Sequence, residues 1–218
     1  MKRLARLVAY AVLGVGLTAS VASAEARTYS IDKAHSEVGF KIKHLFNKTY
    51  GRFADFSGTI QFDPKNVAAS SVDVTIQDST ISTENDRRDG DLRSENFFWV
   101  EKYPTMTFKS TKVIPSKDPN HFQVGGDLTL RGVTKPVVLD VEYDGMGPVA
   151  IQGHSMGTQA GFSAKTTINR KDFGIVWNRQ LDAGGVMLGD DVDISLDIAA
   201  VSPDKPPAGD KSAVNDKK

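Results

Sequence analysis

The sequence contains no cysteine. Disulfide bonds, thiolate chemistry and a lipid attached to an N-terminal cysteine are therefore excluded, and the fold must be stabilised by its core alone. The chain also lacks a surplus of either charge, with 27 basic and 27 acidic residues. Nucleic-acid binding would favour a basic surface, so we do not expect nucleic acid as a partner.

Beyond its N-terminus the chain lacks any apolar run of about 18 residues, the length that indicates a membrane-spanning helix. Its first 24 residues begin with basic side chains, continue with an apolar run over residues 7–17 and end in Ala22-Ser23-Ala24. This order is typical of a secretory signal peptide. The apolar run would span about 17 Å as a helix, and a bilayer core measures about 30 Å, so a membrane anchor is disfavoured. We predict cleavage after Ala24, export, and no stable anchor in the mature protein.

Cleavage would leave residues 25–218, with 24 basic and 27 acidic side chains. This length suffices for one well-packed domain. Residues 202–218 contain three prolines, several charges and no aromatic residue, a composition that predicts a disordered tail. The predicted organisation is therefore a signal peptide at 1–24, one domain at 25–201 and a disordered tail at 202–218.

The central part of the sequence lacks the alternation of strands with long helices. Apolar residues instead recur at every second position, which predicts strands with one buried and one solvated face. Turn signals such as Asp63-Pro64 and Asp144-Gly145 separate these segments. The pattern predicts a mainly β fold, an antiparallel sandwich or barrel. The alternating segments are 38–42, 56–62, 72–76, 106–108, 128–130, 137–143, 162–168 and 192–198.

Residues 83–103 break this pattern, because they are charged first and aromatic afterwards. Thr83 and Ser94 are candidate helix caps, and Gly90 favours two short helical turns over one helix. The following run is Phe97-Phe98-Trp99, whose side chains cannot all share one helix face. We expect at least two of them to turn inward and to close one end of the strand assembly.

Residues 153–157 read GHSMG and match G-x-S-x-G, the nucleophile elbow of many esterases. The elbow requires a helix after the serine, whereas the composition here predicts a loop followed by a strand. It also requires a histidine later in the chain, and no histidine lies beyond Ser155. We interpret the match as incidental.

Candidate metal ligands have simpler explanations. Asp190, Asp191 and Asp193 resemble a cluster for a divalent cation, but alternation places two of them on the solvated face of the last strand. The histidines lie too far apart in sequence for a local metal motif, and we expect His35 to anchor a strand end through a hydrogen bond. The sequence therefore predicts no catalytic residue, no metal and no cofactor.

Four separated motifs give the chain a resemblance to a known family. They are YSIDKAHSEVGFKIKH at 29–44, LRSENFFWVEKYPTMTF at 92–108, LTLRGVTKPVVL at 128–139 and INRKDFGIVWN at 168–178. Over about residues 29–200 the chain resembles the YceI-like family of exported proteins. The resemblance implies a lipocalin-like antiparallel β-barrel of about eight strands, with a short helical segment capping one end. It also implies binding of a polyisoprenoid or another long-chain amphiphilic lipid, and a periplasmic location.

Energetics favour a long ligand. Burial of a methylene contributes about 0.8 kcal/mol, so about twenty carbons contribute roughly 16 kcal/mol, against an association cost of roughly 4–15 kcal/mol. A ligand of about five carbons would gain roughly 4 kcal/mol and would scarcely bind.

The predicted ligand-binding residues are inward-facing apolar side chains, for which core packing is an equally good explanation. Gly58, Ala164 and Thr166 would leave room among them. Arg131 and Lys135 are candidates for contact with an anionic head group, although solvation explains them better. The predicted lining consists of Phe40, Ile42, Ile60, Phe62, Val74, Ile76, Met106, Phe108, Phe173, Ile175 and Trp177.

Three hypotheses stay open from the sequence. The leading one is a periplasmic carrier for a polyisoprenoid or similar lipid. The second is an enzyme that acts on such a lipid. The third is a barrel filled by its own side chains that acts as a partner-binding stress protein. The sequence leaves open whether the protein forms a homodimer.

Overall fold

The computed structural model describes residues 26–203. The predicted signal peptide lies outside the described residues, as does the predicted tail beyond Pro203. The helices of the described chain are α1 (Asp86–Arg93) and the 3-10 turns η1 (Lys33–His35), η2 (Val67–Ala69), η3 (Asp78–Thr80) and η4 (Arg170–Phe173). The strands are β1 (Arg27–Ile31), β2 (Glu37–His44), β3 (Asn47–Phe53), β4 (Phe56–Phe62), β5 (Ser71–Gln77), β6 (Ile81–Ser82), β7 (Thr105–Pro115), β8 (His121–Leu130), β9 (Val133–Ile151), β10 (His154–Asn169) and β11 (Leu188–Ser202).

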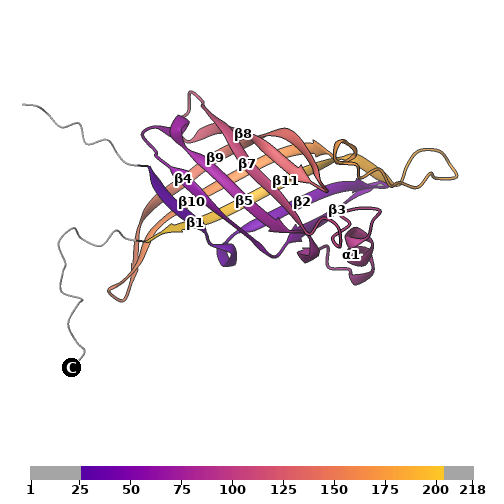
Figure 1. The fold of residues 1–218 in the computed structure, drawn as a ribbon, viewed down its shortest axis with the longest axis horizontal. Helices are drawn as coiled ribbons and strands as arrows, with labels where there is room; N and C mark the ends of the chain where they lie inside the picture. The colour runs from indigo at the N-terminus through magenta and orange to yellow at the C-terminus, as the bar shows by residue number, and fades with distance from the viewer. Residues whose placement is uncertain (1–25, 204–218) are drawn as a thin grey trace, which may run out of the picture.

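The strands of residues 26–203 join one antiparallel sheet that closes on itself (Figure 1). Its order is β1-β4-β5-β7-β8-β9-β10-β11-β2-β3-β6, and β1 pairs in addition with β11. The closing pairs are Ser30 with Val201 and Ile31 with Ala200. The eight strands from β1 to β11 in this order form a closed ring. The predicted mainly β, lipocalin-like barrel is thereby confirmed.

Strand β11 pairs with two strands in succession, and in this way β2, β3 and β6 join the ring. Its last residues pair with β1, and its earlier residues, from Asp197 back to Leu188, pair with β2. β1 and β2 therefore run one after the other along the same neighbouring strand, β11, with the turn η1 between them. The next two strands divide in the same way, because β3 pairs with β2 and β4 pairs with β1.

Ser36 holds the break between β1 and β2 against β11. Its hydroxyl donates to the carbonyl of Asp32 at 2.7 Å and accepts the N–H of Ala199 at 2.9 Å. His35 makes the expected local hydrogen bond, from Nδ1 to Oδ2 of Asp32 at 2.8 Å. The contact that ties this strand end to its neighbour belongs to Ser36, one residue further along.

Alternation decides which face of each strand points inward. In β11, Val192, Ile194, Leu196 and Ile198 line the barrel interior, whereas Asp191 and Asp197 are exposed. This is the arrangement that a period of two imposes on a wall with one apolar and one solvated face. β11 runs to Ser202, which is 5% exposed, one residue beyond the predicted end of the domain.

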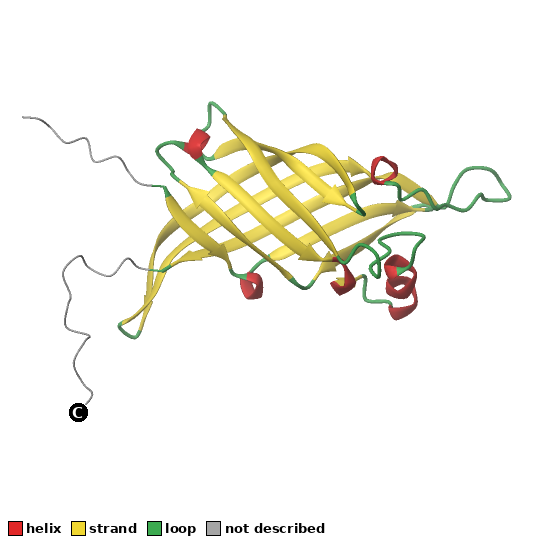
Figure 2. Ribbon diagram, viewed as in Figure 1, coloured by secondary structure: helices red, strands yellow, loops and turns green. Residues whose placement is uncertain are grey.

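Helix α1 lies beyond one end of the strand wall, away from the end where β1 begins and β11 finishes (Figures 1 and 2). It is a single helix that passes through Gly90, so the prediction of two short turns was wrong. Glycine costs only about 1 kcal/mol in a helix, and Asp89 anchors this one by accepting the N–H and the Oγ1–H of Thr83 at 2.9 and 2.5 Å. Asn85 forms the N-cap in place of Thr83, and Ser94, which was expected to begin a second helical turn, is instead the C-cap of α1.

Candidate ligand-binding cavity

The barrel encloses a cavity of about 730 Å³. Inward-facing residues of β2, β4, β5 and β7 to β11 form most of its lining. This volume lies within the range of about 300–1,000 Å³ that is typical of small-molecule pockets. The third hypothesis requires a barrel filled completely by its own side chains, and this cavity contradicts that requirement.

The structure places ten of the eleven predicted residues along the cavity. The exception is Phe173, which is 2% exposed and packs in the hydrophobic core without lining the cavity. Contact of a ligand with these side chains stays a prediction. The ten that line the cavity are Phe40, Ile42, Ile60, Phe62, Val74, Ile76, Met106, Phe108, Ile175 and Trp177.

Several of these apolar side chains are only partly buried, although they point into the barrel. Phe40, Ile60 and Val74 are examples. Their remaining surface faces the cavity, where a second apolar body would remove it from water. Ala164 and Thr166 line the cavity as expected. Gly58 does not line the cavity, and the side chain of Val74 on the neighbouring strand lies against it, with Cγ2 2.9 Å from the position that a Cβ atom would take.

One end of the cavity is bounded by a cluster of aromatic rings. The ring centroid of Phe62 lies 4.8 Å from that of Tyr143, 5.0 Å from that of Phe162 and 6.2 Å from that of Phe122. Phe62, Phe122 and Phe162 all line the cavity. Phe62 closes β4 and Phe122 lies near the start of β8, so the cluster lies toward the end opposite α1.

The other end of the cavity, on the side of α1, is polar and reaches the surface. We call it the mouth. Most of the polar side chains that line the cavity belong to it, and several of them are exposed. The cavity is thus amphipathic, with an apolar body and a polar mouth. The polar residues of the mouth are His44, Thr49, Thr83, Asn85, Arg87, Arg88, Asp91, Asn96, Arg170 and Arg179.

Aromatic residues of the segment after α1 help to form the mouth. Phe97 packs against Trp177 with ring centroids 5.3 Å apart, and Phe98 packs edge-on against Phe53 at 5.6 Å. Both line the cavity, so the expectation that at least two of the three adjacent aromatics turn inward is confirmed. Trp99 instead makes a cation–π contact with Lys102, whose Nζ lies 4.3 Å from the ring centroid.

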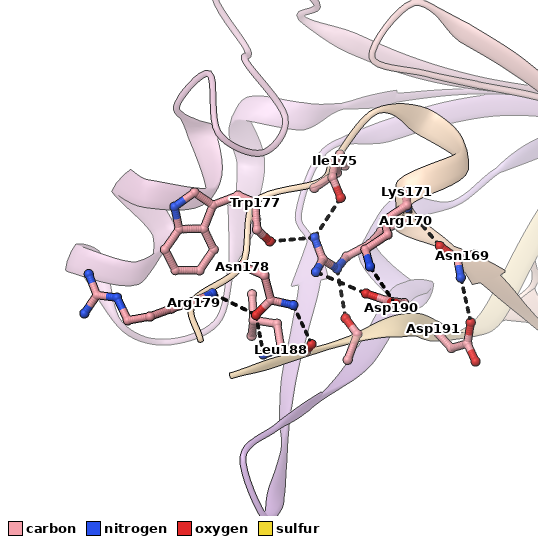
Figure 3. A network of polar contacts seen from close by, with 11 residues as sticks. Asn169, Arg170, Lys171, Ile175, Trp177, Asn178, Arg179, Leu188, Asp190 and Asp191 are labelled. Atoms are coloured by element: carbon pink, nitrogen blue, oxygen red, sulfur yellow. Dashed lines mark hydrogen bonds and ion pairs between the residues drawn. The ribbon is translucent and has the colours of Figure 1, made fainter. Parts of the chain in front are cut away.

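Arg170 fixes the segment that carries Ile175 and Trp177 (Figure 3). It is 3% exposed, and its guanidinium donates to the carbonyls of Ile175 at 2.7 Å, Trp177 at 2.8 Å and Gly189 at 2.9 Å. Burial lowers the pKa of Arg170 from its ordinary value, and Asp190, 3.4 Å away, opposes that shift. The buried guanidinium of Arg170 therefore stabilises the backbone around it through these hydrogen bonds. The charged sequence around Arg170 did not indicate this role.

Asn178 continues this fixation toward the mouth. Its side chain donates to the carbonyl of Leu188 at 2.8 Å and accepts the N–H of Leu188 at 3.0 Å and that of Arg179 at 2.9 Å (Figure 3). The main chain of Met187 in turn accepts the N–H of Leu45 at 2.8 Å. The excursion between η4 and β11 is thus tied back to the barrel on both sides.

The GHSMG motif does not form a nucleophile elbow. It follows the two-residue turn at Gln152 and Gly153, and Ser155 is the second residue of β10, with strands on both sides. The predicted strand after the serine is therefore present, although Ser155 lies in that strand and not in a loop. Its Oγ accepts the N–H of Gly157 at 3.1 Å within the irregular start of the strand.

Two of the three acidic residues near the start of β11 pair with cations, and Asp191 accepts a hydrogen bond from the side-chain amide of Asn169 at 3.3 Å. Asp190 lies 2.8 Å from Nζ of Lys171 and Asp193 lies 3.3 Å from Nζ of Lys48. The hydrogen bond from Thr167, followed by that from Lys48, lowers the pKa of Asp193. Residues 26–203 contain no group of three or more side chains able to hold a metal ion together.

Arg131 and Lys135 do not line the cavity. The guanidinium of Arg131 donates to the carbonyls of Gly174 at 2.9 Å and Glu95 at 2.8 Å, so it ties the mouth segments together from outside. Lys135 is exposed on β9. The candidate contact of these two residues with an anionic head group is therefore not supported.

Asp78 is a buried carboxyl group that the sequence did not single out. It is fully buried, neither carboxylate oxygen has a hydrogen-bond partner of acceptable geometry, and it does not line the cavity. Burial raises the pKa of Asp78 to about 7, and the nearby N–H of Met106 offsets part of that rise.

Among residues 26–203, no helix is both long enough and apolar enough to cross a membrane.

Comparisons with known proteins bear on the barrel as a whole. The YceI-like domain matches residues 29–200. Protein YceI of Escherichia coli O6:H1 is 45% identical over 159 residues, covering 72% of this chain and 80% of that protein. The crystal structure of the Campylobacter jejuni YceI protein is similar with a TM-score of 0.61 at 35% identity, covering 79% of this chain and 96% of that one. A polyisoprenoid binding domain from Saccharophagus degradans has a TM-score of 0.55 at 16% identity, covering 80% of this chain and 98% of that one, a likeness of fold alone.

Proposed function

Because the chain belongs to the family of proteins with a YceI-like domain, we propose that it is a binding protein that holds a polyisoprenoid or another long-chain amphiphilic lipid inside its β-barrel. The observation that carries the proposal is the cavity of about 730 Å³, whose body is lined almost entirely by aliphatic and aromatic side chains. A long chain placed there would bury the surface that these side chains leave exposed, at about 25 cal/mol per Å².

The amphipathic character of the cavity supports the choice of ligand. An amphiphile has one polar end, and the charged side chains that line this cavity belong to one end, the mouth beside α1. The aromatic cluster around Phe62 at the opposite end would meet the tail of the chain. The Saccharophagus degradans domain, described as polyisoprenoid binding, shares the fold and agrees with this assignment.

The proposed setting is the periplasm, where the protein would shield an insoluble chain from water as a carrier. The basic and apolar start of the sequence supports export with cleavage after Ala24. We propose binding without turnover, since Ser155 lies in a strand and outside the cavity lining. The proposal requires neither a cofactor nor a metal.

The test is mass spectrometry of the organic extract of protein purified from the periplasm. Ala164 lines the cavity on β10 and Lys165 follows it on the outer face, so Ala164→Trp and Lys165→Trp form a matched pair. We expect a stoichiometric long-chain lipid in the wild type and in Lys165→Trp, and a reduced amount in Ala164→Trp. Absence of lipid from the wild type, or equal amounts in both variants, would argue against a ligand in the barrel.

An enzymatic role is tested with the same preparations. The Ser155→Ala variant should carry the same lipid, chemically unchanged, as the wild type. A variant that retains an unprocessed lipid, where the wild type holds a chemically modified one, would support the alternative hypothesis of an enzyme acting on an isoprenoid lipid.

A further inference from the structure

The hairpin of β2 and β3 has a basic outer face. The whole chain balances 27 basic against 27 acidic residues, yet residues 38–54 contain no aspartate or glutamate. Alternation directs one face of the hairpin into the cavity lining, so the cations between these residues face outward. These outward cations are Lys41, Lys43, Lys48 and Arg52.

Two of these cations repel each other across the hairpin. Lys43 and Lys48 lie directly opposite in the register of β2 and β3, a position in which like charges are destabilising. Asp193 on β11 offsets part of the charge, since its carboxylate lies 3.3 Å from Nζ of Lys48 and 3.8 Å from Nζ of Lys41. One carboxylate beside four cations leaves the face positive. An acidic residue at position 43 or 48 would give a more stable solvated surface, so the arrangement indicates an anionic partner.

The tip of the hairpin exposes an aromatic side chain between these cations. Phe46, in the turn between the two strands, is fully exposed, and Tyr50 on the outer face of β3 is 67% exposed. Lys43 and Lys48 flank the turn on its two sides. Exposed aromatic rings beside lysines are typical of surfaces that bind an anionic bilayer, where the ring enters the head-group region and the cations meet the phosphates. An acidic protein surface would attract the lysines but would leave Phe46 unexplained.

The tip of the hairpin lies at the open end of the barrel. β2 and β3 extend toward the end at which α1 lies (Figure 1), and His44 and Thr49, near the tip, line the cavity there. The N–H of Leu45 donates to the carbonyl of Met187 at 2.8 Å, which ties the turn to the excursion before β11. A bilayer in contact with the tip would therefore lie beside the opening of the cavity.

We propose that the outer face and the tip of the β2–β3 hairpin dock the protein reversibly on an anionic phospholipid bilayer. The four cations contact lipid phosphates, and Phe46 enters the head-group region. Docking itself does not require a loaded barrel. Its consequence rests on the proposed function: an insoluble chain would pass between the bilayer and the cavity without crossing water.

Flotation with unilamellar vesicles measures the docking of protein purified from the periplasm. The vesicles consist of phosphatidylcholine alone or of equimolar phosphatidylcholine and phosphatidylglycerol. We expect the protein to float with the anionic vesicles and to stay largely in solution with the neutral ones. Salt at about 1 M should release it, because the screening length is then only about 3 Å.

The variants separate the hairpin from general electrostatics. Lys43→Gln/Lys48→Gln should lower the partition onto anionic vesicles about tenfold or more, since each lysine near such a surface contributes roughly fivefold. Its unfolding temperature should stay near the wild-type value, because removal of the opposed charges offsets the lost ion pair. Phe46→Ala should lower the partition roughly tenfold. Lys109→Gln/Lys135→Gln removes the same charge from exposed positions on β7 and β9 and should float as the wild type does.

The Ala164→Trp variant separates docking from the binding of cargo. It should float as the wild type does although it holds less lipid, and loss of its flotation would mean that the cavity, not the hairpin, holds the vesicle. Failure of the wild type to float, or equal flotation of Lys43→Gln/Lys48→Gln, would overturn the docking and leave the lipid-binding function standing. Tighter binding of a polyglutamate peptide than of anionic vesicles would overturn it in favour of an acidic protein partner. Normal flotation of a wild type that holds no lipid would support docking and contradict the proposed function.

Discussion

The ring of Phe40 lies directly over the backbone of Gly51, its partner across β2 and β3. A Cβ atom at residue 51 would lie 2.3 Å from Cζ of Phe40, closer than real contacts allow. The glycine thus gives the ring of Phe40 room to pack against the neighbouring strand inside the barrel, where the ring centroid also lies 5.8 Å from that of Phe53.

The Gly51→Ala variant should therefore push Phe40 out of this position. We expect a loss of about 1–3 kcal/mol in the free energy of unfolding, typical of overpacking, and reduced lipid binding, because Phe40 lines the cavity. Urea denaturation and lipid extraction measure the two effects. Gly147→Ala, on β9, is the control, since nothing lies within 4 Å of its Cβ position. Equal stability of the two variants would contradict the packing argument.

This pair also explains a strand that the sequence did not reveal. β3 reads NKTYGRF, and its inward positions are Thr49, Gly51 and Phe53. The alternation of apolar residues fails in β3 because the ring of Phe40, from β2, occupies the space that a side chain at residue 51 would need. A search for alternating apolar residues detects large inward side chains and misses a strand whose inward positions are small.

The eight segments in which apolar and polar residues alternate are all strands in the structure, and their inward-facing residues form most of the cavity lining. Alternation sufficed because a barrel wall has only two faces. The polar mouth could not be found in this way. Arg87 and Arg179 lie far apart in the sequence, and Arg87 is surrounded by acidic and basic neighbours that resemble an ordinary solvated helix. Only the fold brings both to one cavity.

Asp78 should make stability depend on pH. Its pKa in the folded protein is about 7, raised by burial from 3.8. The folded state therefore binds more protons than the unfolded state between about pH 4 and pH 7, and its stability falls as the pH rises through that window. A shift of this size corresponds to a loss on the order of 4 kcal/mol that is complete above about pH 7.

The Asp78→Asn variant tests this pH dependence. Asn is close in size and does not ionise, so the variant should gain stability relative to the wild type as the pH rises from 4 to 8. Asp32, Asp118 and Asp193 have lowered pKa values and act in the opposite direction at acidic pH. Because both proteins contain them, the difference between the two urea midpoints isolates Asp78. Parallel pH profiles for the two proteins would rule out an ionising Asp78 in the core.

Arg170 should be far more important for stability than its exposed neighbour. Arg170→Met would leave the carbonyls of Ile175 and Trp177 without their buried donor, at a cost of about 3–5 kcal/mol. Lys171→Met removes the other cation beside Asp190, and Lys171 is 45% exposed, so we expect a loss of about 1 kcal/mol or less. Urea denaturation of the two variants compares them. Similar losses would mean that the network in Figure 3 contributes little to stability.

The aromatic cluster around Phe62 should limit the length of chain that the barrel accepts. Phe62 is 2% exposed, lines the cavity and contacts the rings of Tyr143 and Phe162. Phe62→Ala would cost about 3–5 kcal/mol of stability and would extend the apolar space at the end away from the mouth. Mass spectrometry of the bound lipid should therefore show a shift toward longer chains. Lys135→Ala, at an exposed position on β9 outside the cavity lining, is the control and should leave both stability and chain length unchanged. An unchanged chain-length distribution in Phe62→Ala would mean that the tail of the ligand does not reach this end, and the orientation with the head group at the mouth would lose its support.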